Sequence, residues 1–128
     1  MAVSYLSKSL MKKILLVEDT PAIRENVAEY LELRGYDVLV AENGLEGWEL
    51  LQGHQPDLVI CDVKMPKLDG FEIKERANQE VALKDTPFIF LSAAAQKKDI
   101  AKGRSMGAIA YVTKPFDMKE LISWVEKT

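Results

Sequence analysis

The most regular pattern along this chain is a series of apolar runs that each end in polar residues. Runs at residues 14–17, 58–61, 88–91 and 108–112 show no alternation between apolar and polar positions. Such unalternated runs are typical of strands buried on both faces of a parallel sheet. A further apolar segment at residues 36–41 brings the number of predicted strands to five. We therefore expect a parallel sheet with helices covering both faces.

Apolar residues at helical spacing occupy the intervals between these strands. The first interval opens with Thr20 and Pro21, a hydroxyl suited to an N-cap followed by a proline suited to the first helical position. Strand–helix alternation produces parallel, right-handed crossovers, so the pattern predicts a three-layer α/β/α sandwich. The predicted helices run from Thr20 to a stop at Gly35, from Asn43 to a stop at Gly53, from Asp69 to Ala77, from Gln96 to Met106, and from Asp117 to Val125.

Size and charge narrow the possible functions. The chain has 128 residues and a formal net charge of −3, which fits one domain and argues against a nucleic-acid surface. It has no apolar run long enough to span a membrane. The single cysteine, Cys61, excludes an internal disulfide, fits a reducing cytoplasm and is expected to pack in the core. Residues 1–10 are expected to be a tail or extension, because Met11 resembles a second start, and residues 11–128 then form the domain.

Polar residues whose side chains could bind a ligand or take part in catalysis follow four of the predicted strands. They are Glu18, Asp19, Asp62, Ser92 and Lys114. The carboxyl ends of parallel strands lie at one edge of the sheet, where ligands of open α/β folds bind. Clustered carboxylates repel a bare phosphate, but they suit a hard cation such as Mg²⁺, which prefers oxygen ligands. The sequence therefore predicts a cation and phosphate site at this edge.

The same residues fit phosphoryl transfer. A carboxylate such as that of Asp62 is a competent nucleophile, and negative charge then spreads over three equatorial oxygens. Mg²⁺, the Lys114 ammonium and the Ser92 hydroxyl with a backbone N–H group could each stabilise one of them. The peptide bond between Lys114 and Pro115 is predicted to be cis, because such bonds occur in tight functional turns.

These motifs resemble the receiver domain of two-component response regulators, the family that includes chemotaxis regulators, over residues 11–127. The matching features are the acid pair after the first strand, the aspartate before "MPKLDG", the hydroxyl in "FLSA" and the segment "TKPF". The resemblance implies a flavodoxin-like (βα)5 fold with strand order 2-1-3-4-5. It also implies that Asp62 accepts a phosphoryl group from a histidine kinase or a histidine phosphotransfer protein.

The resemblance further implies roles for other residues. Asp19, Asp62 and the main-chain carbonyl of Lys64 would hold Mg²⁺, with Glu18 acting mainly through water. On phosphorylation, Ser92 would move towards the phosphate and the ring of Tyr111 would turn inward. The output face for a downstream protein target would comprise the fourth helix, the fifth strand and the fifth helix.

The implied protein is a switch and not an enzyme with a separate substrate, since it catalyses only its own phosphorylation and dephosphorylation. It would work in the cytoplasm, without a membrane and without direct nucleic-acid contact. Regulators that dimerise through the output face usually carry an acidic stretch there. This chain has Ala108, Ile109, Ala110 and Tyr111 instead, so we expect a monomer.

Three alternatives remain at this point. The chain could be a receiver from a multidomain regulator or a hybrid kinase. It could be a phosphatase of the haloacid dehalogenase type, although that family needs an aspartate two residues after the first, where this chain has Pro21. It could also be a pseudo-receiver that works without phosphate, although such proteins usually lack one of the polar groups present here.

Overall fold

The computed structural model describes residues 11–128, so the tail predicted for residues 1–10 lies outside the described residues. Strands and helices alternate along the chain, as the apolar pattern predicts. The strands are β1 (Lys13–Val17), β2 (Asp37–Ala41), β3 (Leu58–Cys61), β4 (Phe88–Ser92) and β5 (Ala110–Thr113), and the helices are α2 (Pro21–Leu33), α3 (Gly44–His54), α4 (Gly70–Asn78), α5 (Lys97–Ser105) and α6 (Met118–Val125).

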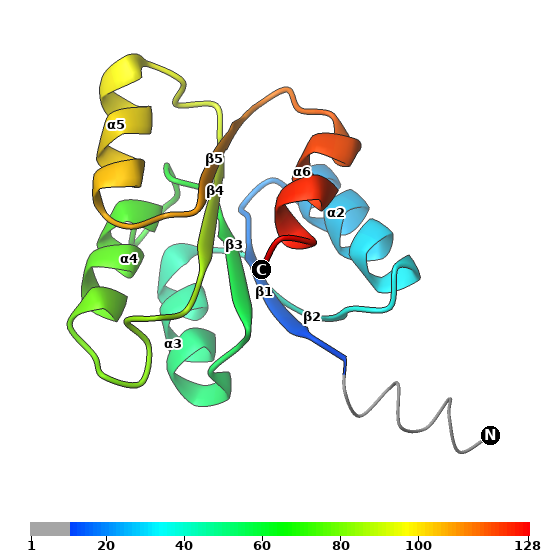
Figure 1. Cartoon of the computed structure of the whole chain (residues 1–128), viewed down its shortest axis with the longest axis horizontal. Coiled ribbons are helices and arrows are strands. Elements are labelled where there is room, and N and C mark those ends of the chain that lie inside the picture. The colour runs from blue at the N-terminus through cyan, green and yellow to red at the C-terminus, as the bar shows by residue number, and fades with distance from the viewer. Residues whose placement is uncertain (1–10) are drawn as a thin grey trace.

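The strands form one parallel sheet in the order β2-β1-β3-β4-β5. Helices α2 and α6 cover one face, and α3, α4 and α5 cover the other (Figure 1). The predicted flavodoxin-like sandwich and its strand order are both confirmed. Because every strand runs in the same direction, all carboxyl ends lie at one edge of the sheet.

Each face of the sheet has its own hydrophobic core. Along β1, Leu15 and Val17 pack into the core beneath α3 and α4, while Ile14 and Leu16 pack into the core beneath α2 and α6. All four side chains are fully buried. A strand between two dry layers needs apolar residues at every position, which explains the unalternated runs.

Two of the residues at which helices were predicted to start, Asn43 and Asp69, cap those helices with their side chains. The side chain of Asn43 accepts a hydrogen bond from the Glu46 N–H group at 2.9 Å. Asp69 accepts from the Glu72 N–H group at 2.8 Å, and the Glu72 side chain accepts from the Asp69 N–H group at 3.1 Å. These contacts satisfy backbone donors that have no partner within the helix.

Two details of the predicted helix ends are wrong. The Thr20 side chain makes no capping hydrogen bond, and the Thr20 N–H group donates to the Glu18 side chain at 3.1 Å. Helix α3 continues through Gly53 to His54, and Gln55 adopts the left-handed conformation with φ of 46°. The Gln55 N–H group bonds to the Leu51 carbonyl, which ends the helix without a glycine.

The last strand begins later than the apolar run predicts. Gly107 has φ of +94°, and the Ala108 N–H group still bonds back to the Gly103 carbonyl. Residue 108 therefore belongs to the end of the preceding turn, and the strand starts at Ala110. The bond between Lys114 and Pro115 is cis, as predicted. None of the helices within residues 11–128 has the length and apolar character needed to cross a membrane.

The loop after β3 is held against the strand end by a close backbone approach at Gly70. A Cβ atom added at Gly70 would lie 2.1 Å from the carbonyl oxygen of Asp62. The Gly70 N–H group also donates to the Val63 carbonyl at 2.7 Å. Only a residue without a side chain permits this contact, and the contact sets where the loop runs beside the sheet edge.

Replacing Gly70 by alanine should therefore destabilise the protein, by about 1–3 kcal/mol, because the added methyl group overlaps the backbone of Asp62. Gly53→Ala is the matched control: an added Cβ there meets nothing within 4 Å, in a helix where glycine is unfavourable. That variant should gain about 0.5–1 kcal/mol. Urea unfolding of both variants measures the difference, and equal stabilities would contradict the steric argument.

Candidate functional site

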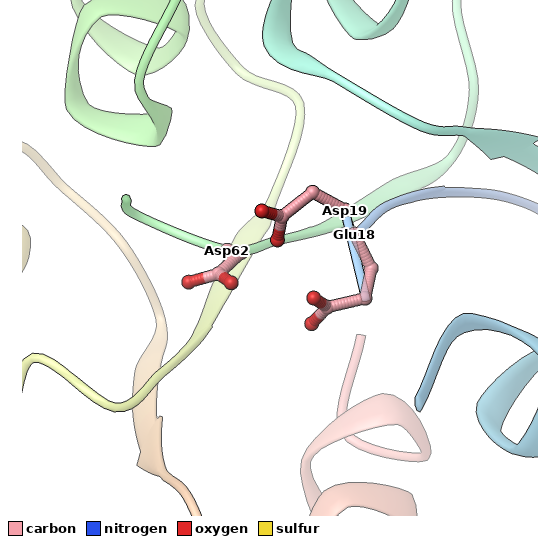
Figure 2. A group of neighbouring side chains, drawn as sticks. All are labelled: Glu18, Asp19 and Asp62. Atoms are coloured by element: carbon pink, nitrogen blue, oxygen red, sulfur yellow. The ribbon is translucent and has the colours of Figure 1, made fainter. Parts of the chain in front are cut away.

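Three carboxylates meet at the carboxyl edge of the sheet. Glu18 and Asp19 follow β1, and Asp62 follows β3 (Figure 2). Val17 and Cys61 are paired across these neighbouring strands, so the acids directly after them lie side by side. One oxygen from each acid lies within 4.8 Å of the others. The predicted convergence of these side chains is present in the structure.

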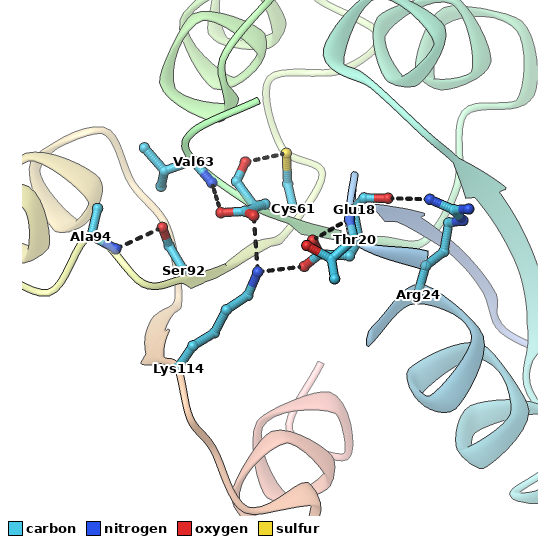
Figure 3. A network of polar contacts seen from close by, with 9 residues as sticks. Glu18, Thr20, Arg24, Cys61, Val63, Ser92, Ala94 and Lys114 are labelled. Atoms are coloured by element: carbon cyan, nitrogen blue, oxygen red, sulfur yellow. Dashed lines mark hydrogen bonds and ion pairs between the residues drawn. The ribbon is translucent and has the colours of Figure 1, made fainter. Parts of the chain in front are cut away.

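Lys114 brings a positive charge to two of these acids. Its Nζ lies 2.8 Å from Oε1 of Glu18 and 2.9 Å from Oδ2 of Asp62 (Figure 3). Burial lowers the pKa of Lys114, but its close contacts with the two acids and their negative charges outweigh burial, so the pKa lies above its ordinary value. The lysine is therefore a permanent cation at the centre of the site.

Glu18 is the most deeply buried of the three acids, with none of its surface exposed. Burial raises its pKa, and the contacts with the Lys114 ammonium and the Thr20 N–H group lower it only in part. The charge of Asp62 adds to the increase. Oε1 of Glu18 touches Lys114 but has no hydrogen bond of good geometry, so this buried oxygen retains capacity for a further electropositive partner.

The backbone beside the acid pair is held by Arg24, which the sequence patterns did not single out. Its Nη1 donates to the main-chain carbonyl of Glu18 at 2.8 Å, and its Nη2 lies 3.3 Å from Glu42. The Glu18 N–H group donates to the Ala41 carbonyl at 3.1 Å. Arg24 therefore joins the end of β1 to α2 and to the segment after β2.

Asp62 is held from both sides of its carboxylate. Oδ1 accepts a hydrogen bond from the Val63 N–H group at 2.7 Å, and Oδ2 accepts one from Lys114. The residue is 6% exposed, so its carboxylate is close to the surface without being freely solvated. Cys61, directly before it, is fully buried, and burial raises its thiol pKa well above the ordinary value. This agrees with the predicted packing role of Cys61.

Ser92 and Tyr111 contact the same short loop. Oγ of Ser92 accepts a hydrogen bond from the Ala94 N–H group at 3.1 Å (Figure 3), and the Tyr111 hydroxyl donates to the Ala94 carbonyl. Ser92 is 1% exposed, whereas Tyr111 is half-buried. Beside this loop is a cavity of about 470 Å³, whose lining includes Lys64, Ala93 and Ala94.

A family model for the response regulator receiver domain matches residues 14–126. The chain belongs to the response regulator receiver family. The DNA-binding dual master transcriptional regulator RpaA of Synechocystis is 40% identical over 90% of this chain and 48% of its own length. This receiver therefore spans about half the length of the curated relatives it matches.

Solved receiver structures share both fold and sequence with this chain. The receiver domain of the Francisella response regulator 1452 has a TM-score of 0.85 and 31% identity, over 91% of this chain and 94% of that one. A receiver domain of a Syntrophus aciditrophicus histidine kinase has a TM-score of 0.82 and 33% identity, over 91% and 88% of the two chains. The chain is thus a receiver domain of the two-component type.

The acid cluster of this receiver fits a divalent cation. Its donors are all carboxylate oxygens, and one oxygen of each acid lies within 4.8 Å of the others. Hard cations such as Mg²⁺ prefer this donor type and retain some water ligands. The resemblance also implies a metal ligand at the main-chain carbonyl of Lys64. Lys64 is exposed and lies two residues after Asp62, at the start of the neighbouring loop.

Removing the Lys114 ammonium should destabilise this receiver, because the negative charges of Glu18 and Asp62 then lose their positive partner. Lys114→Met leaves Glu18 buried without its cation, which should cost about 2–3 kcal/mol of unfolding free energy at pH 8. A carboxyl whose pKa is higher in the folded protein than in the unfolded protein stabilises the fold most at pH values below its unfolded pKa. This stabilisation is lost as the pH rises through its folded pKa. The deficit should therefore be smaller at pH 5, near the ordinary glutamate range.

Urea unfolding at pH 5 and pH 8 measures this pH dependence. Lys119→Met, which replaces an exposed lysine on α6, is the matched control and should stay close to wild type at both pH values. A Lys114→Met deficit that is equal at the two pH values would contradict the role of Glu18 in the effect.

Proposed function

We propose that Asp62 is the phosphoacceptor of a Mg²⁺-dependent signalling switch. The observation that carries the proposal is the position of its carboxylate between two other acids and the Lys114 ammonium. An Asp62 oxygen attacks phosphorus of a phosphohistidine, the new O–P bond forms as the P–N bond breaks, and the released imidazole nitrogen takes a proton. The product is an aspartyl phosphate.

The proposed metal ligands are Asp19, Asp62 and the main-chain carbonyl of Lys64, with Glu18 acting through water. When bound, Mg²⁺ would neutralise charge on the carboxylates and on the incoming phosphoryl group. Glu18 is fully buried, whereas Asp19 is half-buried, so Asp19 is the more accessible member of the acid pair. This difference supports a direct role for Asp19 and an indirect one for Glu18.

Two further groups would stabilise the phosphoryl oxygens. Nζ of Lys114 already lies 2.9 Å from Oδ2 of Asp62. Its ammonium could therefore donate a hydrogen bond to an oxygen of a phosphoryl group attached to Asp62. The Ser92 hydroxyl accepts a bond from Ala94, but it retains its own proton to donate. These donors would stabilise charge that develops during transfer.

The loop at Ala94 would transmit the change. Ser92 and Tyr111 both bind the backbone of Ala94, one through its N–H group and the other through its carbonyl. Movement of Ser92 towards a phosphoryl group would break the first contact and shift the loop that holds Tyr111. The output face is proposed to comprise α5, β5 and α6.

The proposed donor is a histidine kinase or a histidine phosphotransfer protein, and the proposed output is a downstream protein target. We place this exchange in the cytoplasm, with the receiver as a monomer that acts on no separate substrate. The twofold greater length of the curated relatives favours a second possibility, that the receiver works as part of a longer regulator or hybrid kinase. Both possibilities use the same Asp62 chemistry.

Acetyl phosphate with Mg²⁺ should add one phosphoryl group to the wild-type protein and none to Asp62→Asn, which lacks the nucleophilic carboxylate. Intact-protein mass spectrometry measures the increase in mass. Asp69→Asn is the matched control, because the Asp69 side chain caps α4 and asparagine can accept the same capping hydrogen bond. Equal labelling of Asp62→Asn and wild type would overturn the assignment.

Asp19→Asn should weaken Mg²⁺ binding at least about tenfold, because it removes one of the charged oxygen ligands. Titration with Mg²⁺, followed by NMR shifts of backbone amides near Asp62, measures the dissociation constant without requiring phosphorylation. The Asp69→Asn protein should bind Mg²⁺ as the wild type does. If Asp19→Asn retains wild-type affinity, Asp19 is not a ligand.

A further inference from the structure

Strand β2 forms one end of the sheet, and no strand covers its outer edge within residues 11–128 (Figure 1). The Asp37 N–H group donates to the Lys12 carbonyl at 3.0 Å, on the side of β1. Alternate residues of a strand direct their backbone groups to the same side, so Asp37 and every second residue after it bond towards β1. The N–H and C=O groups of Val38 and Val40 therefore face the open edge.

The edge of β2 lacks the features by which proteins usually prevent strand addition. Natural edge strands are protected by proline, by lysine, by a β-bulge or by inward-pointing charges. Strand β2 pairs with β1 in unbroken register along its whole length, and its only charged residue is Asp37, at its start. Val40, near its other end, is 43% exposed. The edge can therefore accept a further strand.

A groove of about 330 Å³ lies between β2 and α2. Val38 and Val40 line it from the strand, and Ala28 adds apolar surface from the helix. Val38 packs against the core beneath α2 and α6, and Val40 follows two residues later, so both side chains point to the α2 face of the sheet. The residues with outward-facing backbone groups thus also present their side chains to the groove.

Three acids of α2 line the same groove. Glu25, Glu29 and Glu32 are exposed, and none of them forms an ion pair within the described part of the chain. Their i, i+4, i+7 spacing places them along one flank of α2. Arg24, the cation among the lining residues, already lies 3.3 Å from Glu42. The groove therefore presents uncompensated negative charge beside an open strand edge.

We propose that an extended, basic segment of a partner protein adds to β2 as a sixth strand of the sheet. Its backbone would hydrogen-bond to Val38 and Val40, and Lys or Arg side chains at alternate positions would face the acids of α2. Two residues of a strand span about 6.6 Å, close to the rise of about 6 Å between Glu25 and Glu29 along the helix. This edge lies outside the proposed output face, and binding there does not require phosphorylation of Asp62.

Other occupants fit this edge less well. In an antiparallel pairing of two β2 edges, the α2 helices of both copies would lie on the same face, and their acids would repel each other. The phosphates of a nucleic acid would meet the same acids. Residues 1–10 of this chain, which lie outside the described residues, contain Lys8 as their only charged side chain, so they offer fewer cations than the groove has acids.

Selection from a random 12-residue peptide display library against the full chain tests this inference. Enriched peptides should carry Lys or Arg at alternate positions, with β-branched or aromatic residues between them. Fluorescence anisotropy measures the dissociation constants of these peptides. Their binding should also shift the backbone amide NMR signals of Val38 and Val40, whose N–H groups would gain partners.

Methylation of the peptide nitrogens separates strand addition from simple charge attraction, because it leaves the charges of the peptide unchanged. Every second N–H group of the added strand would bond to β2. Methylating that alternate set should weaken binding at least about tenfold, whereas methylating the other set should have little effect. Equal effects of the two sets would overturn the proposal.

On the receiver, Glu25→Gln/Glu29→Gln should weaken binding about tenfold, the effect of losing two exposed ion pairs. Glu49→Gln/Glu75→Gln is the matched control, because it removes two exposed acids on α3 and α4 and gives the same net charge. It should bind the selected peptides as the wild type does. Acetyl phosphate labelling of Asp62 should be equal in both variants, so a failure of the phosphoacceptor assignment is read separately.

The proposal is overturned if no peptide is enriched, if the enriched peptides lack alternating cations, or if the two double variants bind them equally. It is also overturned if a synthetic peptide with the sequence of residues 1–10 or a DNA duplex binds the groove as tightly as the selected peptides. A receiver dimer in sedimentation that the peptides dissociate would assign the edge to a second copy and overturn it as well.

Discussion

The structure of this receiver depends on the balance between three buried or half-buried carboxylates and one ammonium. Two unit charges about 5 Å apart repel by about 3 kcal/mol at an effective dielectric of about 20, and the cluster contains more than one such pair. Lys114 contacts Glu18 and Asp62 and offsets part of this repulsion. The remaining electrostatic strain suits a site that attracts a divalent cation.

The rest of the fold maintains this arrangement. Neighbouring strands with two dry faces place Glu18, Asp19 and Asp62 at one edge, and β4 and β5 add Ser92 and Lys114. The backbone is held by contacts that have no role in the core, such as the Arg24 bond to the Glu18 carbonyl. Side chains that repel one another can remain close only where the backbone beneath them is rigid.

The side of the molecule at α5 is built differently. Helix α5 buries only Gly103 and presents cations to solvent, so little apolar burial anchors it. Segments with few buried apolar contacts open and move at low free-energy cost. Ser92 and Tyr111 both form hydrogen bonds with the backbone of Ala94, in the loop between β4 and this helix. A rigid site beside a weakly anchored helix is a physical basis for switching.

The sequence by itself determined the parallel sheet, its two covering layers and the strand-end positions of the site residues, because burial on both faces leaves unalternated runs and parallel strands share one edge. Caps at Asn43 and Asp69 were predictable because they depend on neighbouring residues. Only the tertiary structure placed Arg24 of α2 on the Glu18 carbonyl at the end of β1 and beside Glu42 after β2. Those contacts join elements whose mutual distance and direction are set by packing, which local patterns do not encode.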